Sequence, residues 1–140
     1  MDLAEITRRQ ARFGWMALLV YATLGVVLEL FHGFKIGWYL DVGNEVRQLM
    51  WRLAHAHGSL LAIINIVSAL TLKNLSSTMQ PWMERASQSL TGAAIVMPLG
   101  FFLGGIKVQG GDPWIGILLV PVGAVLLLIG IASTARGIAR

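Results

Sequence analysis

The stretch that decides the fold reads WRLAHAHGSLLAIINIVSALTL and covers residues 51–72. Arg52, His55 and His57 open this otherwise apolar run. A helix rises about 1.5 Å per residue, so a run of this length spans a hydrocarbon layer of about 30 Å. The stretch therefore predicts a transmembrane helix with imidazole groups near one end, where ionisable side chains are costly and point to function.

The composition of the whole chain favours a membrane protein. The 140 residues suffice for one domain, 1–140, and they are 56% hydrophobic and only 13% charged, which is more apolar than soluble domains of this size. The net charge of +4 comes from residues near segment ends, a pattern typical of membrane topology, so we expect no nucleic-acid partner. The chain has no cysteine, which excludes disulfides, iron–sulfur clusters and covalent c-type haem.

Four apolar segments alternate with polar connections along the chain. They cover about residues 13–34, 51–72, 87–106 and 114–133. We expect residues 2–12 to form a short helix at the membrane surface, and Trp38 and Tyr39 to lie in the interfacial aromatic belt. Only helices satisfy their own backbone polar groups in lipid, and the segments lack the period-two alternation of a barrel. The sequence thus predicts an all-α, integral membrane bundle of four transmembrane helices.

Basic residues predict the orientation of this bundle. Of the eleven Lys and Arg residues, seven lie in the two tails and the 73–86 connection, and four lie on the opposite side. This bias predicts that both termini are cytoplasmic in a multi-pass protein of the cell (inner) membrane. The same topology gathers seven polar and aromatic residues in one leaflet, namely Glu29, His32, Arg52, His55, His57, Asp112 and Trp114.

Helical periodicity separates the two histidines of the second segment. At about 100° per residue, His57 points about 160° away from His55, towards lipid or a neighbouring subunit. His55 belongs instead to a stripe of small and polar residues, together with Trp51, Gly58, Ser59, Ala62, Asn65, Ile66 and Ala69. Small residues let another helix or a flat cofactor come close. The His-x-His spacing is therefore a weak metal signal, and His55 alone is the stronger candidate.

A matching stripe runs along the first segment. Gly14, Leu18, Tyr21, Gly25, Glu29 and His32 lie within about 80° of one another on a helix. An acidic residue in a membrane span is costly unless it is paired, protonated or solvated. The stripe is explained either by a Glu29–His32 or Glu29–Arg52 pair that fixes helix packing, or by a polar pocket with a function.

Three kinds of chemistry suit His55 and its neighbours. Haem iron accepts a neutral imidazole, and Arg52, one turn before His55, would meet a propionate. A zinc ion would require three or four ligands, of which Glu29, His32 and His55 would supply three. Proton transfer would require only Glu29 and His32.

Short motifs in all four segments occur in an order and spacing that resemble a known family. They are Ala22-Thr23-Leu24, Gly33-Phe34-Lys35-Ile36, Trp51 four residues before His55, Ala54-His55-Ala56-His57-Gly58, Leu90-Thr91-Gly92 and Gly111-Asp112. In these the chain resembles the styrene oxide isomerase type of small four-helix membrane enzyme and, more faintly, hydroxylaminobenzene mutase.

The resemblance implies a cofactor, an activity and a set of site residues. It implies haem b held noncovalently between protomers of a homotrimer, with His55 as the axial ligand to iron. Ferric iron would act as a Lewis acid that rearranges a small apolar epoxide to an aldehyde without net redox change. The haem contacts would come from His55, Arg52, Trp51, Gly58, Ser59 and His57, and the catalytic pocket from Asn65, Tyr21, Glu29 and His32. The resemblance leaves open whether His32 or His57 is a second ligand.

The sequence departs from the isomerase pattern where the substrate would bind. Leu61 stands where the isomerase has an asparagine, and Asn65 lies one helical turn deeper. The third segment has Phe101 and Phe102 but no tyrosine. Two alternatives therefore stay open beside the isomerase, namely a non-catalytic haem or electron-transfer subunit and a cofactor-free, proton- or ion-coupled membrane protein.

Overall fold

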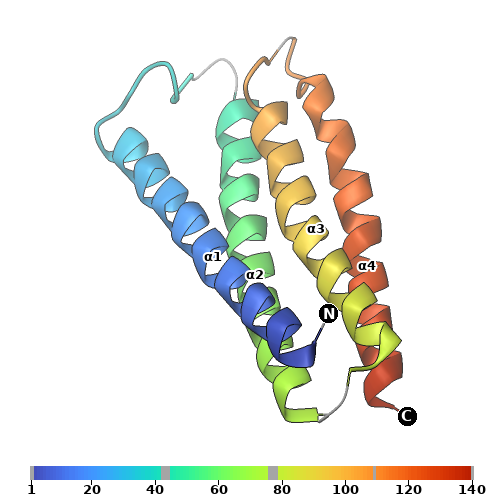
Figure 1. The fold of residues 1–140 in the computed structure, drawn as a ribbon. Helices are drawn as coiled ribbons and strands as arrows, with labels where there is room; N and C mark the ends of the chain where they lie inside the picture. The colour runs from blue at the N-terminus through green and yellow to red at the C-terminus, as the bar shows by residue number, and fades with distance from the viewer. Residues whose placement is uncertain (1, 42–44, 76–78, 109, 140) are drawn as a thin grey trace.

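The structure is a computed structural model that describes residues 2–41, 45–75, 79–108 and 110–139, and it is a bundle of long helices (Figure 1). The helices are α1 (Leu3–Gly33), α2 (Val46–Leu75), α3 (Pro81–Gly104) and α4 (Leu119–Ile138), the last preceded by the 3-10 helix η1 (Ile115–Leu118). The described ranges contain no strand. Four helices are long and apolar enough to cross a membrane, which confirms the predicted all-α architecture with four candidate spans.

The expected separate surface helix at the N-terminus is wrong, because residues 3–12 form the first turns of α1 itself. The apolar side of this segment packs into the bundle, where Leu3 joins Leu72 and Met83 in a buried cluster. Gln10, on the same side, is 1% exposed. The positions turned towards the bundle recur at three- and four-residue intervals, so the helix of the span continues through the polar segment without a break.

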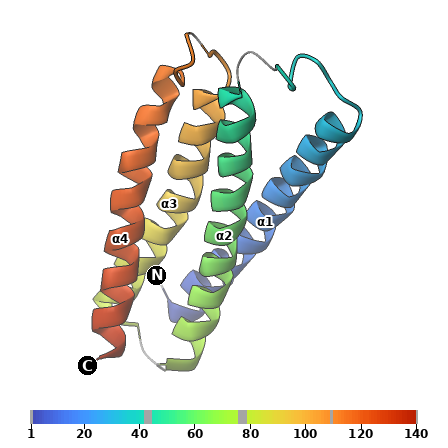
Figure 2. The same cartoon turned by 180° about the vertical axis from the view of Figure 1, so that it is seen from behind.

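Helix α1 leans against the rest of the bundle. It lies close to α2 where α1 begins and α2 ends, and the two helices diverge towards the end of α1 (Figures 1 and 2). Gly14 permits the close approach, since a Cβ atom there would lie 2.7 Å from Cγ1 of Ile66. Both chain ends lie at this closely packed end of the bundle (Figure 1). The axes of α1 and α2 are farther apart at the opposite end of the bundle (Figures 1 and 2).

The Tyr21 side chain supplies a hydrogen bond that α3 lacks because of Pro98. Pro98 has no N–H group, so the carbonyl of Ala94, four residues earlier, loses its intrahelical donor. The Tyr21 hydroxyl donates to that Ala94 oxygen at 2.7 Å. An unpaired carbonyl would be costly in apolar surroundings. Tyr21 therefore ties α1 to α3 at the position where Pro98 leaves a carbonyl of α3 without its intrahelical donor.

Aromatic side chains close the end of the bundle where α1 and α2 diverge. Tyr39 is 1% exposed and stacks on Trp51, so its expected place in an interfacial belt is wrong. Trp38 is 56% exposed and contacts Trp51 edge-on. The Trp51 indole stacks on Phe102 and donates to the Phe102 carbonyl at 3.0 Å, an oxygen that also accepts from the Gly105 N–H at 3.2 Å.

Candidate functional site

The His55 side chain extends from α2 towards α1. One of its ring nitrogens is hydrogen-bonded, and the other has no hydrogen-bond partner among the described residues. Its Nδ1 is 2.8 Å from the backbone oxygen of Tyr21. A carbonyl can only accept, so Nδ1 carries the proton, and the lone pair of the neutral ring is on Nε2. Among the described residues no hydrogen bond engages Nε2. A backbone carbonyl that fixes the tautomer in this way is the usual support of a metal-binding histidine.

Gly25 makes room for the imidazole on α1. A Cβ atom at residue 25 would collide with Cε1 of His55 and lie 2.6 Å from its Nδ1. The ring of His55 is therefore held flat between two backbones, with Tyr21 and Gly25 on one side and its own helix on the other. This placement fixes the direction in which Nε2 points.

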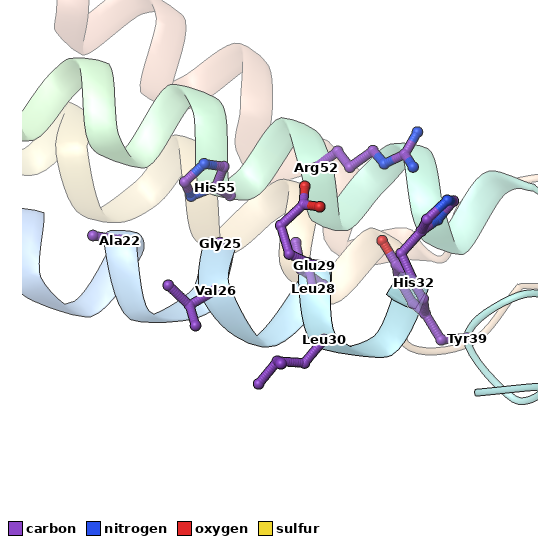
Figure 3. A pocket seen from close by; sticks show the side chains of 10 residues that line it. All are labelled: Ala22, Gly25, Val26, Leu28, Glu29, Leu30, His32, Tyr39, Arg52 and His55. Carbon is purple, nitrogen blue, oxygen red and sulfur yellow. The ribbon is translucent and has the colours of Figure 1, made fainter. Parts of the chain in front are cut away.

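A cavity of about 500 Å³ lies beside His55 in the space between the diverging helices (Figure 3). This volume is within the range of small-molecule sites. The polar side chains at the cavity are His55 and Arg52 from α2, Glu29 and His32 from α1, and Tyr39 from the following loop. The apolar lining comes from Ala22, Gly25, Val26, Leu28 and Leu30. The structure thus brings together four of the seven residues that the sequence assigned to one leaflet, namely Glu29, His32, Arg52 and His55.

The ionisable groups of the cavity are not paired with one another. Glu29, His32 and Arg52 are exposed, and within the described ranges no ion pair joins Glu29 to His32 or to Arg52. The packing explanation for Glu29, which required one of these pairs, therefore loses its support. The carboxylate and the guanidinium remain available to a ligand in the cavity (Figure 3).

The donor set does not form a zinc site. In the described part of the chain no three His, Asp or Glu side chains come together closely enough to hold a metal ion. The His55 ring lies against Gly25 of α1. His32 comes seven residues after Gly25 in the same helix, which places it about 10 Å farther along the axis of α1. Metal–nitrogen bonds of about 2 Å would require the two nitrogens to be about 4 Å apart or less. One ion cannot be shared by these two histidines in this arrangement.

The stripe of small residues on α2 is covered by α1 rather than open to a cofactor. The Tyr21 ring lies on Gly58, where a Cβ atom would collide with it. Ala62 is 0% exposed and faces Gly14 of α1. The Ser59 hydroxyl is buried and has no hydrogen-bond partner in the described structure. The expected haem contacts of Gly58 and Ser59 are therefore occupied by helix packing.

Asn65 is a structural junction of three helices. Its amide nitrogen donates to the carbonyls of Leu61 and Leu90 at 2.9 and 3.1 Å. Its oxygen accepts from Gln10 at 3.3 Å and from Thr91 at 3.2 Å. The side chain is 0% exposed, and these four bonds use both donors and both acceptor sites. Asn65 consequently does not line the cavity, and neither does the Tyr21 side chain, which is engaged with α3.

Two further expected haem contacts lie on the other side of α2. His57 is half-buried with its ring 4.8 Å from that of Phe101 on α3, and its Nδ1 donates to the Leu53 carbonyl at 2.9 Å. The expectation that His57 faces lipid or another subunit is wrong, because α3 packs there. Trp51 points to α3 as well. The separation of His55 and His57 onto different faces agrees with the helical periodicity.

The sequence assigns no site role to six of the residues that line the cavity, among them Gly25 and Tyr39. Gly25 was visible in the small-residue stripe of the first segment, and its position seven residues before His32 was the available signal. Tyr39 gave no such signal, since its burial depends on how the connection after α1 folds back on Trp51.

The chain matches no protein-family model, no curated protein and no solved structure. The family resemblance therefore stays a prediction.

Proposed function

We propose that the protein is a haem b-binding membrane protein in which His55 is the axial ligand. The observation that carries the proposal is the Nδ1 bond of His55 to the Tyr21 carbonyl, which leaves Nε2 unpartnered beside a cavity of about 500 Å³. Haem iron suits this site better than zinc, because the porphyrin supplies four ligands and the chain must supply only one strong donor.

The residues at the cavity fit the chemistry of a haem group. Val26, Leu28 and Leu30 are apolar, and Arg52 is a cation without an ion-pair partner in the described ranges, as a propionate would require. The haem-binding set that we propose is therefore His55, Arg52 and the apolar wall of α1. Gly58, Ser59, Trp51 and His57 are left out of it.

We further propose that the activity is an isomerisation of a small apolar substrate of the epoxide type. Bound ferric haem would supply a Lewis acid for this reaction. The apolar wall of α1 would hold the substrate and exclude water. Glu29 and His32, at the polar end of the cavity, would hold or transfer a proton. The separation of His55 and His32 favours this reading over a bis-histidine electron-transfer subunit, because these two side chains would not bind one metal ion together.

The absorption spectrum of the detergent-purified protein tests the proposal. After expression with adequate haem supply we expect a Soret band, and a ferric spectrum that is five-coordinate or water-ligated. His55→Ala should abolish haem binding, whereas His57→Ala, a matched control on the same helix, should largely retain it. Absence of the Soret band would reject haem binding and favour a cofactor-free proton function of Glu29 and His32. A low-spin, bis-histidine spectrum would instead favour electron transfer.

The proposal also includes location and assembly. The charge bias supports cytoplasmic termini in the cell (inner) membrane, and the resemblance supports a homotrimer with haem between protomers. Cysteine labelling at each helix end, with membrane-impermeant reagent, would test the first. Light scattering of the detergent complex would test whether the protein is a homotrimer.

A further inference from the structure

A second pocket lies between α3 and α4, at the end of the bundle that holds both chain ends. Its volume is about 180 Å³, and it is lined by Trp82, Arg85, Ser133, Arg136 and Gly137. It shares no residue with the cavity at His55. A pocket of this size is too small for a drug-sized ligand but large enough for a single compact group such as a phosphate.

The pocket gathers hydrogen-bond donors that have no acceptor in the described structure. Arg85, Arg136, the Ser133 hydroxyl and the Trp82 indole N–H form no hydrogen bond or ion pair with any described residue. The acidic neighbour Glu84 accepts a hydrogen bond from Gln88. Two guanidinium groups at one small pocket repel each other unless an anion lies between them.

The indole is seated in the wall of the pocket. A Cβ atom at Gly137 would collide with the Trp82 ring, so the ring lies directly on the backbone of α4. Tryptophan with a free N–H is typical of the boundary between lipid tails and headgroups. The pocket therefore sits at the depth where lipid phosphates lie, if the four helices cross a bilayer.

An apolar surface leads from the pocket into the hydrocarbon region. At about 100° per residue, Ile129 and Val122 lie on the same side of α4 as Ser133. They are 41% and 51% exposed. A ligand with a phosphate in the pocket could lay an acyl chain along this surface, which a free phosphate ion could not do.

We propose that this pocket binds the phosphate headgroup of an anionic membrane lipid. Guanidinium groups bind phosphate oxygens through paired, charge-assisted hydrogen bonds. Basic pockets between transmembrane helices are suited to phosphate-bearing lipid headgroups. This lipid site does not depend on haem binding, so its test is independent of the function proposed for His55.

Native mass spectrometry of the detergent-solubilised protein tests the proposal. The wild type is offered phosphatidylglycerol and phosphatidylcholine with identical acyl chains, and we expect it to retain phosphatidylglycerol preferentially. Arg85→Gln/Arg136→Gln should weaken phosphatidylglycerol binding about 30-fold, the combined contribution of two basic side chains at a membrane surface. Arg85→Lys/Arg136→Lys keeps the charge and should lose less.

The control removes the same charge elsewhere. Arg8→Gln/Arg9→Gln changes two exposed arginines of α1 and should keep the wild-type lipid preference. Equal loss in this control, or an unchanged preference in the Arg85/Arg136 glutamine variant, would overturn the proposal. A third arm adds inorganic phosphate in excess. Failure to displace the lipid supports a lipid site, whereas full displacement would show a site for free phosphate and reject the lipid proposal.

Discussion

Replacing Gly25 with alanine tests whether α1 holds His55 in its present position. The added Cβ atom would collide with Cε1 of His55 and lie 2.6 and 2.9 Å from Nδ1 and Nε2. The imidazole is rigid, and both flanking helices are packed, so the ring must leave the Tyr21 carbonyl to accommodate the methyl group. Gly33→Ala is the matched control, because nothing lies within 4 Å of a Cβ atom there.

The magnitude follows from three opposing contributions. Alanine raises helix stability by up to about 1 kcal/mol over glycine. Overpacking costs about 1–3 kcal/mol, and loss of the His55–Tyr21 hydrogen bond costs about 1 kcal/mol more. We therefore expect Gly25→Ala to lower the free energy of unfolding by about 1–3 kcal/mol relative to the wild type. Gly33→Ala should leave this free energy unchanged or raise it slightly.

Two measurements check this prediction. Reversible unfolding in mixed micelles gives the stability difference between the variants and needs no haem. A haem titration followed at the Soret band should show 10- to 100-fold weaker binding for Gly25→Ala, the usual cost of disturbing a group that orients a metal ligand. If Gly25→Ala matches Gly33→Ala in both assays, the ring of His55 is not confined by α1 and the tautomer argument fails.

Three more variants test other contacts. Tyr21→Phe should lower stability by about 1 kcal/mol. In a Pro98→Ala background the same change should cost much less, because residue 98 then supplies its own N–H, and a double-mutant cycle on unfolding free energies measures the difference. Asn65→Leu should destabilise the fold by about 2–3 kcal/mol, since it leaves buried polar partners unpaired, yet the position of the Soret band should not change. Arg52→Gln should weaken haem binding about tenfold, as expected for loss of one charge-assisted contact, and an unchanged titration would remove Arg52 from the site.

The helices were the predictable part of the fold. Hydropathy located all four candidate spans, but it placed the second at 51–72, whereas α2 covers Val46–Leu75. The reason is that hydropathy marks the lipid-crossing portion, while backbone hydrogen bonds continue through polar residues. The same effect explains why residues 3–12 belong to α1.

The sequence predicted which face of α2 carries each histidine, but it did not predict which helix packs against each face. Periodicity correctly assigned His55 and His57 to different faces of α2. It did not indicate that α1 would cover Gly58 or that α3 would cover His57, because a small-residue stripe looks the same whether a helix or a cofactor packs on it. The role of Asn65 was missed for a similar reason, since its four hydrogen-bond partners come from three helices that periodicity alone does not position.

Because α1 leans away from α2, a ligand would enter the cavity at His55 from the lipid phase. Its wall includes Val26 and Leu30, which are 61% and 50% exposed and would face lipid in a bilayer. A molecule dissolved among the acyl chains would then reach the cavity by sideways diffusion, without crossing water. Its working concentration would be set by partitioning between water and membrane, so apparent affinities measured in water should rise with the oil–water partition coefficient of the compound.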